Sequence, residues 1–203
     1  MGRPARHARS TILDCAKHVS AEVGPQKLTI AAVAERAGAP VGSIYHRYAS
    51  RHEILAAVWL DLVEEFQGRF LAALEGGEPV AAALDAVGYT CRWVRRHPRE
   101  ARLMLLHRRE DFAAEHWPQS YRRRAEKLAA QAGESLRRYA ARLLGRGRSA
   151  ELRIVRFILV DLPTAALKRD IEAGMSPSKG LEAVLLDTCT DALRRARARP
   201  TKK

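Results

Sequence analysis

Four side chains near residue 45 carry the kinds of hydrogen-bond donor that nucleic-acid recognition uses. They are Tyr45, His46, Arg47 and Arg51. Phenol, imidazole and guanidinium groups can donate to phosphate oxygens and base edges, and arginine is the commonest reader of guanine. Just before them, Gly42 and Ser43 are small enough to bring a helix backbone close to DNA. The spacing predicts contacts in the major groove of double-stranded DNA.

Two short helices and a tight turn are expected to position these side chains. Thr29–Ala37 is predicted as the first helix, Gly38-Ala39-Pro40 as the turn and Val41–Arg47 as the second helix. Helix, glycine turn and helix form the helix-turn-helix arrangement, which suits a major groove. The helix starts at Thr29 and Val41 also offer free N–H groups to phosphate oxygens. Spacing alone leaves an alternative, in which both helices belong to an ordinary bundle.

A contiguous pattern surrounds this segment. Its parts are Ile12-Leu13, Cys15-Ala16, Val23-Gly24, Leu28-Thr29, Val33-Ala34-Glu35-Arg36-Ala37-Gly38, Gly42-Ser43-Ile44-Tyr45, Tyr48, Ser50-Arg51 and Glu53-Ile54-Leu55. With this pattern, residues 10–60 resemble the DNA-binding domain of the TetR (tetracycline-repressor-like) family of bacterial transcription regulators. The resemblance implies a three-helix DNA-binding head, a helical ligand-binding body and a homodimer.

The resemblance also implies a role for each matching residue. Thr29 would contact phosphate at the start of the second helix of the head. Tyr45 and Arg51 would hold phosphates, with Arg51 in place of the usual lysine. The recognition helix would carry Val41, Gly42, Ser43, Tyr45 and His46.

Three positions depart from the family pattern. Pro40 stands where a capping serine is common, and proline is tolerated at a helix start. Ala31 stands where some relatives have a base-reading arginine. Arg47 replaces a frequent histidine or small polar residue, so it is either an added phosphate or guanine contact or a solvated charge.

Basic residues also occur at both ends of the chain. Arg3, Arg6, His7 and Arg9 precede the first expected helix, and a basic run covers Arg194–Lys203. A basic arm beside a helix-turn-helix can lie in the minor groove, and a disordered tail is the alternative. The C-terminal run is predicted to be a solvated tail, with a DNA contact as the alternative.

The 203-residue chain is predicted to be all-α, with about nine helices. Apolar residues recur every three or four positions, and no segment alternates with period two for long. Ser50 and Glu53 form a capping-box pattern at the start of a long helix, and Glu53 is expected to reach back to Ser50. We expect a DNA-binding domain with its basic arm over residues 1–50. Residues 51–203 would then form a helical ligand-binding and dimerisation domain.

Composition and charge narrow the class of protein. The formal net charge of +13 points to a polyanionic partner. Arginine clusters outside the head are either solvated faces or an extended DNA-facing or ligand-attracting surface. Cys15, Cys91 and Cys189 form no disulfide framework or CxxC motif, so a reducing, cytoplasmic location is expected. No signal peptide or membrane-spanning run is expected.

No catalytic pattern or cofactor motif is found in the sequence. His97, His107 and His116 are spaced too irregularly for a helical metal site. GxSxG, P-loop and GxGxxG motifs are missing, and no cysteine occurs in a recognisable nucleophile setting. We therefore predict a protein that is not an enzyme and that carries no cofactor and no metal.

The body is where a small-molecule effector would bind, between helices that offer apolar side chains and a few polar groups. The candidates are Tyr89, Trp93, Leu103, His107, Phe112, Trp117, Tyr121, Leu159 and Asp161. Pro163 is expected to kink its helix and to free the carbonyl of Leu159. An aromatic stripe that belongs simply to the core is the alternative.

The last two helices are predicted to form the homodimer interface. Ser149–Ala173 carries apolar residues on more than one face, so it needs burial on two sides. A dimer would present two recognition helices to an inverted-repeat operator. The sequence thus predicts a ligand-responsive transcription regulator, most often a repressor in this family. An architectural DNA-binding protein without a ligand, or a helical partner-binding module, are the alternatives.

Overall fold

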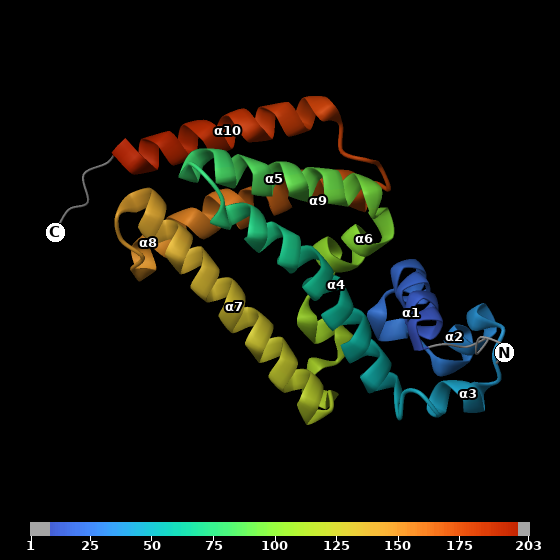
Figure 1. The fold of residues 1–203 in the computed structure, drawn as a ribbon. Helices are drawn as coiled ribbons and strands as arrows, with labels where there is room; N and C mark the ends of the chain where they lie inside the picture. The colour runs from blue at the N-terminus through green and yellow to red at the C-terminus, as the bar shows by residue number, and fades with distance from the viewer. Residues whose placement is uncertain (1–8, 199–203) are drawn as a thin grey trace, which may run out of the picture. The chain divides into compact units, whose positions relative to one another are not determined.

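The computed structural model describes residues 9–198, and within that range every regular element is helical (Figure 1). The first half contains α1 (Arg9–Val23), α2 (Ile30–Ala37), α3 (Val41–Tyr45), α4 (Arg51–Glu75), α5 (Pro79–Arg96) and α6 (Pro98–Leu106). The second half contains α7 (Gln119–Leu144), α8 (Ser149–Arg156), α9 (Leu162–Glu172) and α10 (Lys179–Ala198). Short 3-10 segments are η1 (Pro25–Lys27), η2 (Arg109–Phe112) and η3 (Ala114–His116). The all-α prediction is confirmed for these residues.

Packing contacts divide the chain into two compact units. Unit 1 comprises the chain up to Val63 together with Arg99–Glu126, and unit 2 comprises Glu64–Pro98 together with the chain from Lys127. Helices α4 and α7 each begin in unit 1 and continue into unit 2. Unit 1 therefore contains more than the expected DNA-binding segment. The expected functional division at residue 50 stays a prediction.

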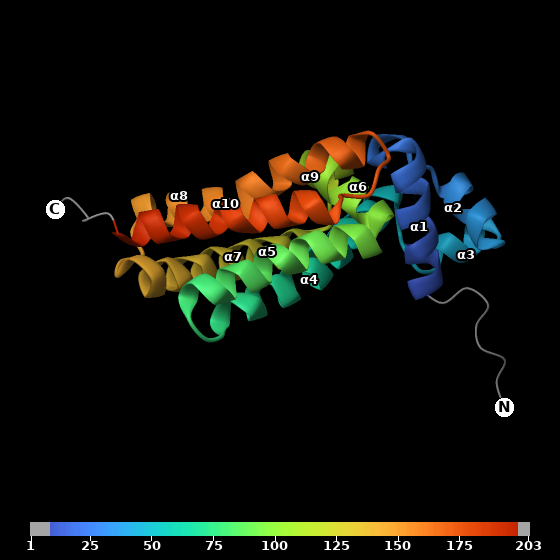
Figure 2. The same cartoon turned by 90° about the horizontal axis from the view of Figure 1, so that it is seen from above.

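Unit 1 is built on the packing of α1 against α2. Ile12, Ala16 and Val19 recur every three or four residues on α1, and each is at most 5% exposed. Val33 and Ala34 of α2 are at most 3% exposed. Residues with this spacing share one face of a helix, so burying them fixes the orientation of α2. Figure 2 shows α2 and α3 beside α1.

In unit 2, α5 lies alongside α10 (Figures 1 and 2). The apolar face of α5 is buried at Val80, Ala83, Val87, Cys91 and Val94. The inner face of α10 is buried at Leu185, Cys189 and Leu193. Both faces follow the helical period.

The segment before Pro163 contains a π-helical turn, and the expected kink stays a prediction. A π-helical segment, η4 (Phe157–Asp161), joins α8 to α9, so residues 149–172 form one continuous helix and nine helices result in the described chain. In this wider register the N–H of Leu162 donates to the carbonyl of Phe157. Pro163 has no N–H and cannot donate to a carbonyl of this helix, and the expected release of the Leu159 carbonyl stays a prediction.

The thiol of Cys189 on α10 donates to a carbonyl of this π-helical segment. Its Sγ donates to the carbonyl oxygen of Ile158 over 3.5 Å. Burial raises the pKa of the Cys189 thiol to about 11, so the sulfur keeps its proton at neutral pH. The protein itself thus supplies a donor to the carbonyl of Ile158, next to the Leu159 carbonyl that the sequence assigned to a ligand.

Candidate nucleic-acid interface

The turn between α2 and α3 is set by a glycine in the left-handed conformation. Gly38 has φ 58° and ψ 34°, which side chains with a Cβ rarely adopt. The N–H of Ala39 donates to the carbonyl of Ala34 over 3.0 Å, and the N–H of Gly38 donates to that of Glu35 over 3.1 Å. These two bonds form a Schellman motif, which ends α2 and redirects the chain into α3.

Helix α3 divides its side chains between the core of unit 1 and solvent. Ile44 and Tyr48, one turn apart, are 0% and 1% exposed. On the opposite side, Val41 and Tyr45 are 44% and 51% exposed, and His46 is also exposed. An exposed valine beside an exposed tyrosine forms an apolar and hydrogen-bonding surface that unit 1 itself does not cover.

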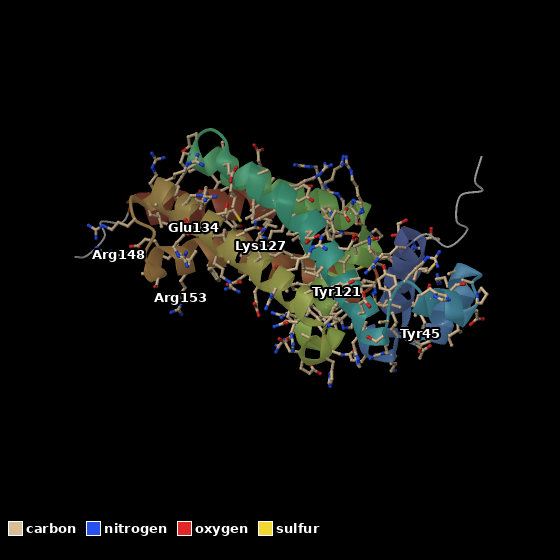
Figure 3. All side chains as sticks on the ribbon, turned by 60° about the horizontal axis from the view of Figure 1, so that its bottom comes forward. Tyr45, Tyr121, Lys127, Glu134, Arg148 and Arg153 are labelled. Carbon is tan, nitrogen blue, oxygen red and sulfur yellow. The ribbon has the colours of Figure 1, made fainter. Side chains whose placement is uncertain are left out.

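The two small residues of α3 leave that surface open. Gly42 is exposed, and a Cβ placed on it would have no neighbour within 4 Å. Ser43 is half-buried. We name the exposed residues of this helix the α3 outer face: Val41, Gly42, Tyr45 and His46. Figure 3 labels Tyr45 on this helix.

Two of the other predicted DNA-binding residues already have bonds within the head. The Oγ1 of Thr29 caps α2 by accepting from the N–H of Ala32 over 3.1 Å. Its own O–H remains able to donate to a phosphate oxygen. Arg47 is half-buried, and its Nη1 donates to the carbonyl of Ser43 over 3.2 Å.

Arg51 forms hydrogen bonds inside unit 1. Its Nε donates to the carbonyl of Leu28 over 2.6 Å. Its Nη2 donates to the carbonyls of Pro25 and Gln26, over 3.1 Å and 2.5 Å. The guanidinium thereby ties the first turn of α4 to η1, and Nη1 is the group left to reach a phosphate. The phosphate role of Arg51 stays a prediction.

A polar network that the sequence analysis missed surrounds the start of α1. The Nη2 of Arg9 donates to the Tyr121 hydroxyl over 2.5 Å and to Glu53 Oε1 over 3.1 Å. The Tyr121 hydroxyl in turn donates to the same Glu53 oxygen over 3.0 Å. The guanidinium of Arg9 also lies 4.4 Å from the ring centroid of Tyr48, whose hydroxyl donates to the Arg9 carbonyl.

This network corrects the expected capping box. Ser50 Oγ accepts from the N–H of Glu53 over 3.1 Å, as expected. The Glu53 carboxylate, however, accepts from the N–H of Ala49 over 2.7 Å rather than from Ser50. Burial, together with the bond to Glu53, raises the pKa of Tyr121 to about 12. Arg9 is therefore anchored, whereas Arg3, Arg6 and His7 of the predicted arm lie outside the described residues.

The nine predicted effector residues divide between the two units. Unit 1 contains Leu103, His107, Phe112, Trp117 and Tyr121, and unit 2 contains Tyr89, Trp93, Leu159 and Asp161. Trp117 is 2% exposed, and its Nε1 donates to the carbonyl of Phe112 over 2.8 Å. Leu103, Phe112 and Leu159 are each 1% exposed, whereas Asp161 is exposed.

Two of these residues carry side-chain nitrogens whose surroundings differ from those of a purely apolar core residue. His107 lies 3.7 Å from Asp111, and burial lowers the pKa of its imidazole. Trp93 is 4% exposed, and its Nε1 is buried without a hydrogen-bond partner in the described chain. It packs against Phe66, and the two ring centroids are 5.1 Å apart. The ring of Phe66 also lies 5.6 Å from that of Tyr89, centroid to centroid.

Sequence reasoning also missed a groove of about 650 Å³ between α4 and α7 in unit 2. Small residues, Gly68 and Ala72, line it with carboxylates that include Glu64 and Glu134. Glu134 is labelled in Figure 3. The residues that line the groove come from two helices that are distant in sequence. The only local sign was the small residues among charged ones on α4.

The outer sides of α8 and α10 carry exposed apolar side chains in unit 2. Ile154 and Phe157 are 42% and 56% exposed, and Val184 on α10 is 63% exposed. Large apolar side chains grouped on neighbouring helices commonly mark an interaction surface. This is the surface that the sequence assigned to the homodimer.

Comparison with known proteins bears on these surfaces. Residues 12–58 match the family model of the bacterial regulatory proteins of the tetR family. A search of the curated proteins gives no match. Among solved structures, the transcriptional regulator FadR from Bacillus subtilis, in complex with stearoyl-CoA, superposes with a TM-score of 0.67 at 14% identity. The aligned region covers 93% of this chain and 97% of that chain.

Two further structures show the same likeness. A transcriptional regulator from Rhodococcus sp. Rha1 gives a TM-score of 0.66 at 22% identity, covering 96% of this chain and 100% of that one. The TetR-family regulator PfmR from Thermus thermophilus gives 0.69 at 19% identity, covering 90% and 97%. At these identities, the likeness shows a shared fold.

A helix-turn-helix whose second helix exposes its outer face is the arrangement that many DNA-binding proteins place in a major groove. The match over residues 12–58 shows that this segment is similar to the bacterial regulatory proteins of the tetR family, and it supports a TetR-family transcription regulator. Within residues 9–198, no helix combines the length and the apolar character needed to cross a membrane.

Proposed function

We propose that the protein is a ligand-responsive transcription regulator of the cytoplasm and that it acts as a repressor. It would bind an inverted-repeat operator as a homodimer through its last two helices. The observation that carries the proposal is the α3 outer face, where Val41 and Tyr45 are 44% and 51% exposed beside Gly42. Such residues at the start of a recognition helix can reach base edges and phosphates.

Selection from a random duplex library at near-physiological salt tests this function. The proposal expects an enriched inverted repeat, because two symmetry-related recognition helices read two half-sites. Tyr45→Ala should lose the enrichment, whereas Val23→Ala, at a valine 47% exposed on α1, should keep it. Retention that depends steeply on salt without any enriched motif would instead support an architectural protein, which the net charge of +13 favours.

The effector is proposed to be an apolar molecule with a hydrogen-bond acceptor, bound next to Trp93. Supporting this, the buried Nε1 of Trp93 has no partner in the described chain, among aromatic rings of α4 and α5. A buried donor without a partner is costly, so an acceptor on a ligand would relieve the cost. One structural relative holds stearoyl-CoA, which makes an acyl thioester a reasonable first probe.

A thermal-shift screen of apolar acceptor-bearing compounds, with stearoyl-CoA included, tests the effector site. Trp93→Phe keeps the ring but removes the donor, so it should weaken the stabilisation that a true effector produces. Unchanged stabilisation in Trp93→Phe would place the effector elsewhere. The effector can release DNA only through a difference in its affinity for two arrangements of the protein. Helix α4 runs from unit 1 into unit 2 and is the proposed lever.

A further inference from the structure

We propose that the outer sides of α8 and α10 carry a charge pattern that selects a second copy of this chain and fixes its direction. Helix α8 of one copy would lie parallel to α10 of the other, with opposite charges facing each other. This inference rests on the proposed homodimer. It adds to that proposal the charged residues that recognise the partner copy and the register in which α8 and the partner's α10 would lie.

The outer strip of α8 and η4 begins with positive charge and ends with negative charge. Arg153, Phe157 and Asp161 follow one another at helical spacing, and all three are exposed, with Arg156 exposed beside them. The π-helical segment adds to this alignment, because its wider turn brings Asp161 back over Arg153. Figure 3 shows Arg153 projecting outward from α8.

The outer strip of α10 has the opposite order. Asp187, Asp191 and Arg195 are spaced four residues apart and are all exposed, next to Val184. The opposite side of the same helix is buried in unit 2. The strip thus runs negative, negative, positive in the chain direction, whereas the α8 strip runs positive, positive, negative.

In the part of the chain that the structure describes, most charges of the two strips have no ion-pair partner, whereas a neighbouring charge on the inner side of α10 has one. Glu182 on the inner side of α10 forms an ion pair of 2.6 Å with Arg95. Within residues 9–198, neither Asp187 nor Asp191 has an ion-pair partner, and the same holds for Arg153 and Arg195.

The remaining pair, Arg156 with Asp161, is long and exposed. It joins Arg156 Nε to Asp161 Oδ1 over 3.9 Å, with the two side chains 68% and 54% exposed. A contact of this kind contributes little and is easily exchanged for another partner. Both strips are therefore free to pair with another molecule.

A second copy matches this surface better than another partner would. A two-fold interface must be self-complementary, and a surface with both strips meets this condition when α8 faces the partner's α10. In the parallel direction, Arg153 faces the partner's Asp187, Arg156 faces the partner's Asp191, and Asp161 faces the partner's Arg195. The antiparallel direction would set Arg153 against the partner's Arg195 and Asp161 against the partner's Asp187, which repel. A nucleic acid would meet the two aspartates of α10.

A charge swap tests the proposal. One variant carries Arg153→Glu with Arg156→Glu, and the other carries Asp187→Arg with Asp191→Arg. Each alone faces like charges across the interface, so its dimer dissociation constant should rise about tenfold or more. Mixed in equal amounts, the two variants should form a heterodimer, because opposite charges then face each other at both contacts. Analytical ultracentrifugation and native mass spectrometry measure both results.

A matched control makes the same charge change elsewhere. Arg96→Glu with Arg123→Glu alters two exposed arginines that lie outside the two strips, and this variant should dimerise as the wild type does. Thermal unfolding of every variant shows whether it folds. The losses in the two strip variants should also shrink as salt is raised, because exposed charges are screened.

The direction of packing has its own measurement. Oxidation of an Arg153→Cys chain mixed with an Asp187→Cys chain should give a cross-linked heterodimer. The mixture of Arg153→Cys with Arg195→Cys should give much less. A reversed ratio would overturn the parallel register.

The other outcomes separate this inference from the proposed function. If both strip variants stay dimeric while Phe157→Asp becomes monomeric, the interface stands and the charge pattern is overturned. If Phe157→Asp also stays dimeric, the dimer lies elsewhere and the interface assignment fails. A monomeric wild-type protein overturns the homodimer itself, and the charge inference with it.

Discussion

The α3 outer face and the predicted effector residues make an instructive pair. The residues of the α3 outer face lie within one turn-and-helix segment and are exposed together. The nine effector candidates divide between unit 1 and unit 2, and several are fully packed against their own neighbours. The α3 surface depends on local spacing, whereas the effector candidates were grouped because they are aromatic or polar. Residue type alone does not separate a ligand contact from a core contact.

Trp117 and Trp93 show the same difference within the effector set. Trp117 satisfies its Nε1 through the carbonyl of Phe112, and the guanidinium of Arg109 lies 5.2 Å from its ring. Trp93 is similarly buried, yet its Nε1 has no partner in the described chain. Two tryptophans that look alike in the sequence therefore differ in what they leave available for a ligand.

The largest expected effect is on the stability of unit 1. Trp117→Ala should lower the free energy of unfolding by about 3–5 kcal/mol, because it removes a fully buried ring and creates a cavity. Urea unfolding measures the loss. A small change would mean that Trp117 is a ligand contact and not a core residue. The effector residues would then resemble the α3 outer face in being available to a partner.

Arg51→Ala is expected to have the next largest effect. It removes three charge-assisted hydrogen bonds to η1 and Leu28, so unfolding should become easier by about 2–3 kcal/mol. DNA affinity should fall as well. Arg51→Lys serves as the control, since it keeps the charge but not the fork of donors. Full stability with lost DNA binding would assign Arg51 to phosphate alone.

Tyr45→Ala should separate binding from stability. The side chain is 51% exposed, so unfolding should change by less than about 0.5 kcal/mol, as for most surface positions. Affinity for the selected operator should fall about tenfold, equivalent to about 1.4 kcal/mol. Fluorescence anisotropy on labelled DNA gives the comparison. Equal losses in stability and affinity would show that the α3 outer face is structural.

Tyr121→Phe should lower the free energy of unfolding by only about 1 kcal/mol at neutral pH, for the lost hydroxyl bonds. The effect of this substitution on the free energy of unfolding should depend on pH at alkaline values. The fold raises the pKa of Tyr121 from 10.0 to about 12, so the neutral phenol is favoured in the folded state. This contribution is complete below pH 10 and is lost as the pH rises toward 12.

Unfolding curves of wild type and Tyr121→Phe, collected across that range, should therefore converge with rising pH. Curves that stay parallel would show that Tyr121 titrates normally and that its bond with Glu53 contributes nothing special. The other tyrosines are the same in both proteins, so they do not affect the difference.

Much of the fold was readable from sequence because its signals are local. The period of Ile12, Ala16 and Val19 indicates a helix and its buried face before any partner is known. Gly38 predicts the end of α2, because few other residues adopt a positive φ there. Ile44 and Tyr48, four residues apart, indicate the inner side of α3 and so, by elimination, its outer face.

Other features required positions that no local pattern contains. Arg51 matches a phosphate-binding position by sequence, but the nearness of η1 turns most of its donors inward. The bond of Glu53 with Tyr121 joins residues 68 positions apart, and the bond of Cys189 to the carbonyl of Ile158 joins residues 31 apart. Such pairs depend on how helices pack, which is a property of the whole chain.

The sequence by itself determined the helices and the helix-turn-helix segment, because helical period, glycine turns and caps act over a few residues. Tertiary structure alone decided which polar groups are satisfied. Among the described residues, it brought the Cys189 thiol to the carbonyl of Ile158, left the donor of Trp93 buried without a partner, and left Arg153 and Asp187 without ion pairs. The physical reason is that hydrogen bonds and ion pairs act over a few ångströms in space, whatever the distance along the chain.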